Sequence, residues 1–285
     1  MSEPIRHHYL PVFYLNHWAG ADGKVIRYYR PHRDVVASSI SPKFTGFEQG
    51  LYRLDGYDPE SENDIEKKFM APLVDDPASR AMEALIERNQ SNLTPEFRQA
   101  WTRFVMSLHV RHPGNVAQIT RQARSGLRQS LLEDPRDYAA VRKNSDPPTL
   151  VEWVELNAPF ILDNYGKQML PEIITHQGTS DAIIHMRWWT IGIPGDIPDL
   201  LTCDRPVFMS HGVHDERCFI ALPLGPRIVF FATRSQATFD RVMSRDFRVV
   251  AKSINETLVS QAINSVYSSS RQHHRFVQNR LRSIG

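Results

Sequence analysis

Short runs of β-branched and aromatic residues, separated by turn residues, characterise the first sixty positions of the chain. Runs at 24–30, 35–40 and 51–54 predict β-strands, and the Asp22-Gly23 dipeptide before the first run predicts a turn. The segment 11–18 predicts a short helix, because its proline stands in the first turn, where a missing N–H costs nothing. We therefore expect a small antiparallel sheet with this opening segment packed against it.

Helical spacing replaces the strand pattern in the middle of the chain. Residues 64–73 and 78–88 predict two helices, interrupted at Pro72 and Pro77. Thr94 is a good N-cap and precedes the clearest helix of the sequence. The apolar stripe of that helix consists of Phe97, Trp101, Phe104, Val105 and Leu108.

The helical pattern resumes after a break at 111–114, which contains a proline and a glycine. We expect one helix over 115–133 and another that Thr149 caps. The apolar face of the second is predicted to consist of Trp153, Leu156, Phe160 and Ile161.

Strand spacing returns in the last third of the chain. The predicted elements are strands at 183–193, 200–203, 218–222 and 228–232 and a long final helix at 250–276. The order strand, helix, strand, helix predicts an α+β fold, with small antiparallel sheet elements at both ends of the chain packed around a mostly helical middle. We expect a single domain over 1–285, with approximate lobes at 1–60, 61–180 and 181–285.

Composition narrows the class of protein without naming a function. The 285 residues are 41% hydrophobic and 23% charged, and the formal net charge is +2. So small a charge argues against a strong general attraction to nucleic acid or to a membrane. Only two cysteines are present, too few for a disulfide scaffold. With no membrane-spanning run and no secretory signal, we expect a cytoplasmic protein.

The opening segment 7–18 is unusually dense in histidine and aromatic residues. Such a cluster must be buried, because an isolated chain end normally frays. Its expected partner is the strand that ends in Leu201-Thr202-Cys203-Asp204. We therefore predict contact between the opening segment and this strand.

Several short motifs follow one another in a familiar order. They are His8-x-x-Pro11-x-x-Tyr14-Leu15, Ile65-Glu66, Leu108-His109-Val110-Arg111, Thr202-Cys203-Asp204-Arg205-Pro206 and Leu222-Pro223-Leu224-Gly225-Pro226. On these motifs the chain resembles, over nearly its whole length, a bacterial family known as domain of unknown function 4238. It departs from the family pattern at Cys203, where a serine is expected, and at Trp18, where phenylalanine is more usual. The resemblance implies the architecture and the choice of site, but no reaction.

His8 and Asp204 are the first candidate site residues. The imidazole of His8 could act as a general base or bind a divalent metal, and the carboxylate of Asp204, at a strand end, could complete that metal site or orient the histidine. The alternatives are structural: His8 hydrogen-bonded to a backbone carbonyl, and Asp204 capping its own turn before a proline.

Glu66 and Arg111 are the second pair of candidates. Glu66 could add a carboxylate to the site, and Arg111 a planar fork for phosphate or carboxylate. The alternative is a buried Glu–Arg pair that ties two helices together.

The sequence contains no complete metal-binding, nucleotide-binding or serine hydrolase motif. His211-Gly212-Val213-His214-Asp215 is interpreted as a solvated loop. Two groups of arginines, at 121, 124 and 128 and at 271, 275, 280 and 282, could contact nucleic acid, although such runs are usually solvated helix faces.

Two hypotheses of function remain. The first is a non-catalytic binding or interaction protein in which the terminal histidine segment and Asp204 are structural. The second is a metal-dependent hydrolase that acts on a phosphorylated or nucleic-acid substrate through His8 and Asp204, with Glu66 and Arg111 as helpers.

Overall fold

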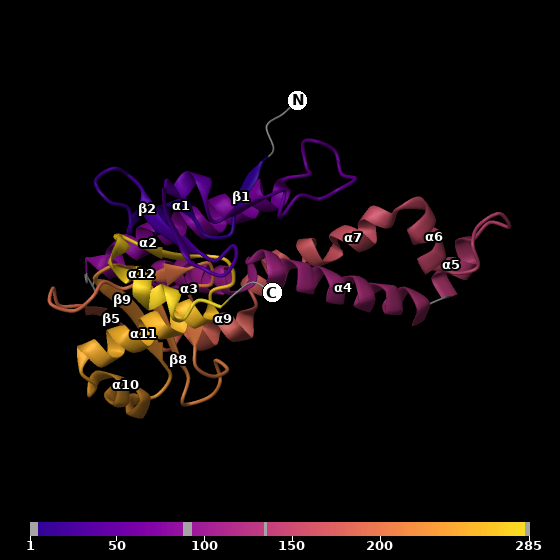
Figure 1. The fold of residues 1–285 in the computed structure, drawn as a ribbon. Helices are drawn as coiled ribbons and strands as arrows, with labels where there is room; N and C mark the ends of the chain where they lie inside the picture. Colours follow the sequence, from indigo (N-terminus) through magenta and orange to yellow (C-terminus); the bar gives the residue numbers. More distant parts are fainter. Residues whose placement is uncertain (1–4, 88–92, 134–135, 283–285) are drawn as a thin grey trace.

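Two four-stranded antiparallel sheets and a two-stranded ribbon combine strands that lie far apart in the chain (Figure 1). The computed structural model describes residues 5–87, 93–133 and 136–282. Its strands are β1 (Arg6–His8), β2 (Val25–Tyr29), β3 (Val36–Ile40), β4 (Phe47–Gln49), β5 (Arg187–Gly192), β6 (Thr202–Cys203), β7 (Phe208–Met209), β8 (Phe219–Gly225), β9 (Ile228–Thr233) and β10 (Val266–Ser268). β1 pairs with β4, and the larger sheets have the orders β3-β2-β10-β6 and β5-β9-β8-β7.

Helices occupy the middle of the chain and cover the sheets. The α-helices are α1 (Val12–Asn16), α2 (Asp76–Ile86), α3 (Pro95–Val110), α4 (Pro113–Glu133), α5 (Arg136–Val141), α6 (Leu150–Asn157), α7 (Pro159–Gln168), α8 (Leu170–Ile174), α9 (Gln177–Ile184), α10 (Gln236–Met243), α11 (Phe247–Gln261) and α12 (His274–Gln278). The described residues also form two 3₁₀ turns, η1 (Pro42–Phe44) and η4 (Arg271–His273), and a π-helix, η2 (Ile65–Asp75). The fold class is α+β, as the sequence predicts. Within the described ranges no helix has the length and apolar character needed to cross a bilayer.

The β5-β9-β8-β7 sheet lies between two layers of helices (Figure 1). Successive side chains of a strand point to opposite faces, so neighbours in sequence enter different cores. Trp188 and Phe230 face the main core, where Phe230 meets Trp101 of α3 with ring centroids 5.6 Å apart. Trp189 and Phe231 face the other way, toward α10 and α11. The outer face of the sheet is therefore itself apolar and covered by helices.

The opening segment is buried against the strand that ends at Asp204, and this prediction is confirmed. The Tyr14 hydroxyl lies 2.9 Å from Thr202 Oγ1 and donates to the Pro223 carbonyl at 2.8 Å. The indole N–H of Trp18 donates to the Leu200 carbonyl at 2.9 Å. Tyr14 and Trp18 are fully buried, so the aromatic residues of this segment belong to the core.

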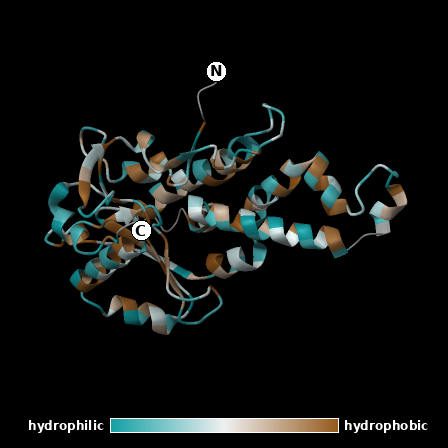
Figure 2. Cartoon of the chain, turned by 45° about the vertical axis from the view of Figure 1, so that its right-hand side comes forward, coloured by the Kyte–Doolittle hydropathy of each residue, from teal (hydrophilic) through white to brown (hydrophobic). Residues whose placement is uncertain are grey.

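A helical arm projects from the body of the molecule (Figure 1). Its backbone is α4, whose 21 residues extend roughly 30 Å at the usual helical rise. α7 packs along it in the opposite chain direction, with α5 and α6 at the tip. Val116 is the buried residue of α4, which is otherwise solvated and largely teal or white in Figure 2.

Both predicted N-caps are confirmed. Thr94 accepts the backbone N–H of Phe97 at the start of α3. Thr149 and Glu152 form a reciprocal capping box at the start of α6. The single apolar face predicted beyond Thr149 is wrong in part. The helix breaks at Ala158, so Phe160 and Ile161 belong to α7, and Leu156 of α6 is 73% exposed.

Two predictions about the N-terminal half are wrong. Residues 51–54 form a turn and irregular backbone, and the strand of this region is β4, between Gly46 and Gly50, whose positive φ angles favour glycine. Pro72 and Pro77 do not interrupt the helical run, because Pro72 lies within η2 and α2 follows η2 directly. Pro77 lies in the first turn of α2, where its missing N–H has no partner to lose.

Two predictions about the C-terminal third are also wrong. The strand predicted at 183–193 begins only at Arg187, after α9. The helix predicted at 250–276 ends at Gln261, and β10 follows it as an inner strand between β2 and β6. Val266 and Tyr267 suit a helical stripe as well as a strand, so pairing with distant strands decides their conformation.

Candidate functional site

Asp204 is buried and fully engaged with the backbone of the turn between α11 and β10. Its Oδ1 accepts the N–H of Ile263 at 3.0 Å. Its Oδ2 accepts the N–H groups of Asn264 and Ser265, the latter at 3.1 Å. A carboxylate that accepts three backbone N–H groups orders a turn that would otherwise bury unpaired donors. The arrangement favours a structural role for Asp204, although the turn that it caps is this distant one and not its own, as the sequence-based alternative has it.

The imidazole nearest to Asp204 is that of His112, whose Nε2 lies 3.8 Å from Oδ2. The Tyr9 ring packs edge-on against His112, with centroids 5.4 Å apart. No hydrogen bond or ion pair joins His8 to Asp204 in the described part of the chain. From the sequence, His112 stands out only as part of a helix break, since nothing local links it to a residue about ninety positions away.

His8 lies at the end of β1, opposite Phe47 of β4, with ring centroids 5.5 Å apart. Burial lowers the pKa of its imidazole, the nearby charge of Arg111 lowers it further, and a hydrogen bond with the Lys43 backbone opposes both. The neighbouring His7 accepts the Tyr52 backbone N–H at 2.9 Å. Burial lowers the pKa of His7 to about 4, so this ring is a neutral part of the core at neutral pH.

Arg111 is completely buried at the C-terminal end of α3. Its Nη1 donates to Asp75 Oδ1 at 2.9 Å, and its guanidinium lies 5.4 Å from the centre of the Phe104 ring. Nε and Nη2 have no hydrogen-bond partner among the described residues. The partner of Arg111 is thus Asp75, which the sequence analysis did not single out.

Glu66 and Asp75 stand at the two ends of the π-helix η2. They are nine positions apart, which is about two turns of a helix with i→i+5 hydrogen bonds, so the π winding places them on one face. Burial raises the pKa of Glu66 to about 7, the charge of Asp75 raises it further, and Arg111 lowers it. The charge of Arg111 therefore acts on both His8 and Glu66, although no hydrogen bond or ion pair joins these three side chains among the described residues.

These two buried groups of residues differ from the site that the sequence predicts. Of the four candidates, Arg111 acts electrostatically on His8 and Glu66, whereas Asp204 is bound to the turn between α11 and β10. Among the described residues, no three His, Cys, Asp or Glu side chains converge as metal ligands do. The metal role of His8 and Asp204 remains a sequence-based prediction. The contacts of Arg111 with Asp75 and of Asp204 with the backbone are those of residues that stabilise a fold.

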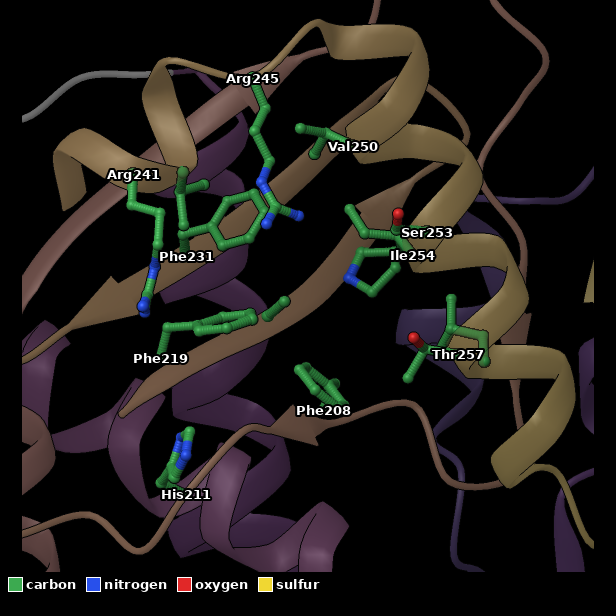
Figure 3. A pocket seen from close by; sticks show the side chains of 14 residues that line it. Phe208, His211, Phe219, Phe231, Arg241, Arg245, Val250, Ser253, Ile254 and Thr257 are labelled. Atoms are coloured by element: carbon green, nitrogen blue, oxygen red, sulfur yellow. The ribbon is translucent and has the colours of Figure 1, made fainter. Parts of the chain in front are cut away.

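A pocket of about 380 Å³ opens between the outer face of the β5-β9-β8-β7 sheet and the helices α10 and α11 (Figure 3). Its floor is aromatic: Phe208 and Phe219 lie 5.4 Å apart between centroids, and Phe219 and Phe231 lie 6.5 Å apart. Its apolar walls are completed by Ala221, Pro223, Val242, Val250, Ile254 and Leu258. A concave apolar site with few polar groups is the usual form of a small-molecule site.

The polar groups of the pocket come from its rim. Arg241 and Arg245 extend from the α10 side, His211 lies on the loop after β7, and Ser253 and Thr257 lie on α11 (Figure 3). This pocket is not among the sites predicted from the sequence. A signal did exist, because Phe219 and Phe231 occupy strand positions that face away from the main core and have to be covered.

A second and more polar pocket, of about 690 Å³, lies on the other side of α11. Its arginines are paired with acids: Arg227 with Asp199, Arg248 with Asp196 and Arg280 with Glu256. On the arm, Arg124 and Arg128 are similarly paired with Asp163 and Glu155. These contacts fit the interpretation of the basic runs as solvated, ion-paired helix faces.

The fold and these sites describe an α+β protein with an apolar pocket and two buried polar groups of residues, one around Arg111 and one around Asp204. The sequence profile of a family described as "Protein of unknown function (DUF4238)" matches residues 6–272. The chain therefore belongs to the DUF4238 family, as its motifs indicate. Neither a curated protein nor a solved structure matches it.

Proposed function

We propose that this protein is a non-catalytic binding protein that holds an apolar small molecule in the pocket above Phe208, Phe219 and Phe231. The observation that carries the proposal is a pocket of about 380 Å³ that opens to solvent above an aromatic floor and apolar walls, with its polar groups at the rim. Soluble domains normally cover such a surface, and those that leave it open generally use it for binding. Each buried CH₂ of a ligand would contribute roughly 0.8 kcal/mol.

The hydrogen bonds of Asp204 support a binding protein over a metal-dependent hydrolase. Its oxygens already accept three backbone N–H groups, and a metal would have to compete with them. Both cysteines are unpaired and buried, which agrees with the reducing cytoplasm that we expect to be the site of binding.

Filling the pocket tests the proposal. Ser253 is exposed on α11 and lines the pocket, so Ser253→Trp should occupy it without disturbing the core. The neutral fluorescent probe N-phenyl-1-naphthylamine should bind the wild type saturably, and Ser253→Trp should weaken its affinity by at least about tenfold, the equivalent of losing one or two buried CH₂ groups.

The matched control is Ser125→Trp, which makes the same change at an exposed position of α4, on the arm. It should bind the probe as the wild type does, and circular dichroism should show both variants folded. Absence of saturable binding to the wild type, or equal binding by Ser253→Trp, would refute the proposed function.

A further inference from the structure

We infer that the ligand of this pocket is an anionic amphiphile, whose apolar body lies on the phenylalanine floor and whose negative head group lies between Arg241 and Arg245. This inference rests on the proposed function and adds the chemical class of the ligand. It comes from the charges at the rim, which are independent of the apolar walls.

Every ionisable side chain that lines the pocket is basic. The pocket has Arg241, Arg245 and His211 at its rim and no aspartate or glutamate among its lining residues. Arg245 makes no side-chain hydrogen bond or ion pair with any residue that the structure describes, and Arg241 makes only a long one, 3.4 Å to Thr238 Oγ1. Two arginines with free donors therefore face one apolar pocket.

The acids nearest in sequence to these basic groups are engaged elsewhere. Asp240 accepts the Gln236 side-chain amide at 2.7 Å, and Asp246 caps α11 through the backbone N–H of Arg248 at 2.6 Å. Asp215 is bound by the Arg217 guanidinium at 2.7 Å. This contrasts with the second pocket, where each arginine pairs with an acid, and it leaves Arg241 and Arg245 without an ion pair among the residues that the structure describes.

The geometry of the rim suits a compact planar anion. Arg241 and Arg245 are four positions apart, and their side chains both reach over the Phe219 and Phe231 side of the pocket (Figure 3). A guanidinium offers a fork that matches a carboxylate, and carboxylates bind arginine more strongly than neutral groups do. The hydroxyls of Ser253 and Thr257 face the pocket from α11, where they can donate to the same head group or to water.

The size of the pocket limits the apolar body. A cavity of about 150 Å³ holds one benzene ring, so about 380 Å³ corresponds to roughly two such rings or an alkyl chain of comparable volume. A medium-chain carboxylate such as decanoate represents this class of ligand and serves as the probe.

The test compares three probes that share a ten-carbon chain and differ in the head group. At pH 8, decanoate, decanol and decyltrimethylammonium are each used to displace N-phenyl-1-naphthylamine, the two ions below their micellar concentrations and decanol below its solubility limit. Decanoate should bind about tenfold more tightly than decanol, because two partly exposed arginines contribute severalfold each, and the cation should bind most weakly. Arg241→Gln and Arg245→Gln should each reduce the decanoate-to-decanol ratio severalfold, and the double variant should bring it near one.

Arg121→Gln is the matched control, since it removes the same charge from an exposed position of α4. Its decanoate-to-decanol ratio should equal that of the wild type. Equal affinity for decanoate and decanol, or a ratio that survives in the double variant, would overturn the anionic head group while leaving an apolar ligand in place. Failure of all three probes to displace the dye, with the dye itself bound, would also overturn the inference. Failure of the dye to bind at all would remove the proposed function on which it rests.

Discussion

At the scale of single residues, two pairs of adjacent residues, His8-Tyr9 and Arg111-His112, link two buried polar groups. Each pair contributes one side chain to the group around Arg111 and one to the group around Asp204. His8 is influenced by the charge of Arg111, whereas Tyr9 packs on His112. Arg111 binds Asp75, whereas His112 lies beside Asp204. The end of β1 and the end of α3 therefore supply one residue each to both groups, which ties the opening segment to the helical middle.

A substitution at Asp204 tests most directly whether its hydrogen bonds to the backbone stabilise the fold. An asparagine keeps one acceptor oxygen and loses the charge, so Asp204→Asn leaves at least one N–H of the α11–β10 turn without its partner. We expect a loss of about 2–3 kcal/mol in the free energy of unfolding, measured by urea denaturation. Asp246→Asn, in which one exposed N–H loses the charge of its cap, should cost less than about 1 kcal/mol. Similar small losses in both variants would contradict the structural role of Asp204.

Glu66 should make the protein less stable as the pH rises. Its pKa is about 7 in the folded state against 4.5 as the reference value, so the folded state favours the protonated acid. Its penalty is absent below pH 4.5, grows through the window from about 4.5 to 7, and is complete above it. After allowance for partial exposure, Glu66→Gln should gain roughly 1–2 kcal/mol over the wild type at pH 8 and almost nothing at pH 4.

His7 acts in the opposite direction over nearly the same window. Its pKa of about 4 in the folded state lies below the reference value of 6.5, so its contribution is present above pH 6.5 and is lost as the pH falls toward 4. In Glu66→Gln this dependence is no longer offset, and stability should rise from pH 4 to pH 6.5. Glu172→Gln, at an exposed position of α8, is the control and should follow the wild-type profile. An unchanged profile in Glu66→Gln would be evidence against the buried, protonated acid.

The candidate site could be predicted only in part, for a reason that these residues make clear. Glu66, Arg111 and His8 could be chosen from their residue types, and the charge of Arg111 does act on the other two. Asp75, Tyr52 and the three backbone donors of Asp204 could not be chosen, because they come from distant parts of the chain. Partners of a buried polar group are set by tertiary packing, which a single sequence does not display.

At the scale of elements, local signals determined what the sequence could predict. The helix α3 was identified from Thr94 and its apolar stripe, both of which are local. For the residues of β10 the sequence predicts the end of a helix, because Val266 and Tyr267 satisfy both periodicities. Their conformation follows from pairing with β2, about 240 positions away in sequence. The π winding of η2 was equally invisible, although it places Glu66 and Asp75 on one face.

At the scale of the whole molecule, the body and the arm are stabilised by different means. The body has sheets covered by helices, with Trp101, Phe104 and Phe230 completely buried. The arm has few buried residues, and α4 and α7 meet there by close backbone approach at Gly166. A Cβ at this position would lie 2.9 Å from the backbone N of Thr120 and 3.1 Å from the backbone O of Ile119. The arm is therefore sensitive to a change that adds a single methyl group.

Gly166→Ala should loosen the arm and leave the body intact. The new methyl group meets backbone atoms of α4, which cannot move aside as a flexible side chain could, so α7 must separate from α4. We expect a cost of about 1–3 kcal/mol, the usual range for overpacking. Hydrogen exchange should accelerate in α4 and α7, while protection in β8 and β9 stays at the wild-type level.

Gly126→Ala is the matched control, because a Cβ there has nothing within 4 Å. That variant should gain up to about 1 kcal/mol from helix propensity alone. Equal exchange in α4 for both variants would show that the two helices do not depend on contact at Gly166.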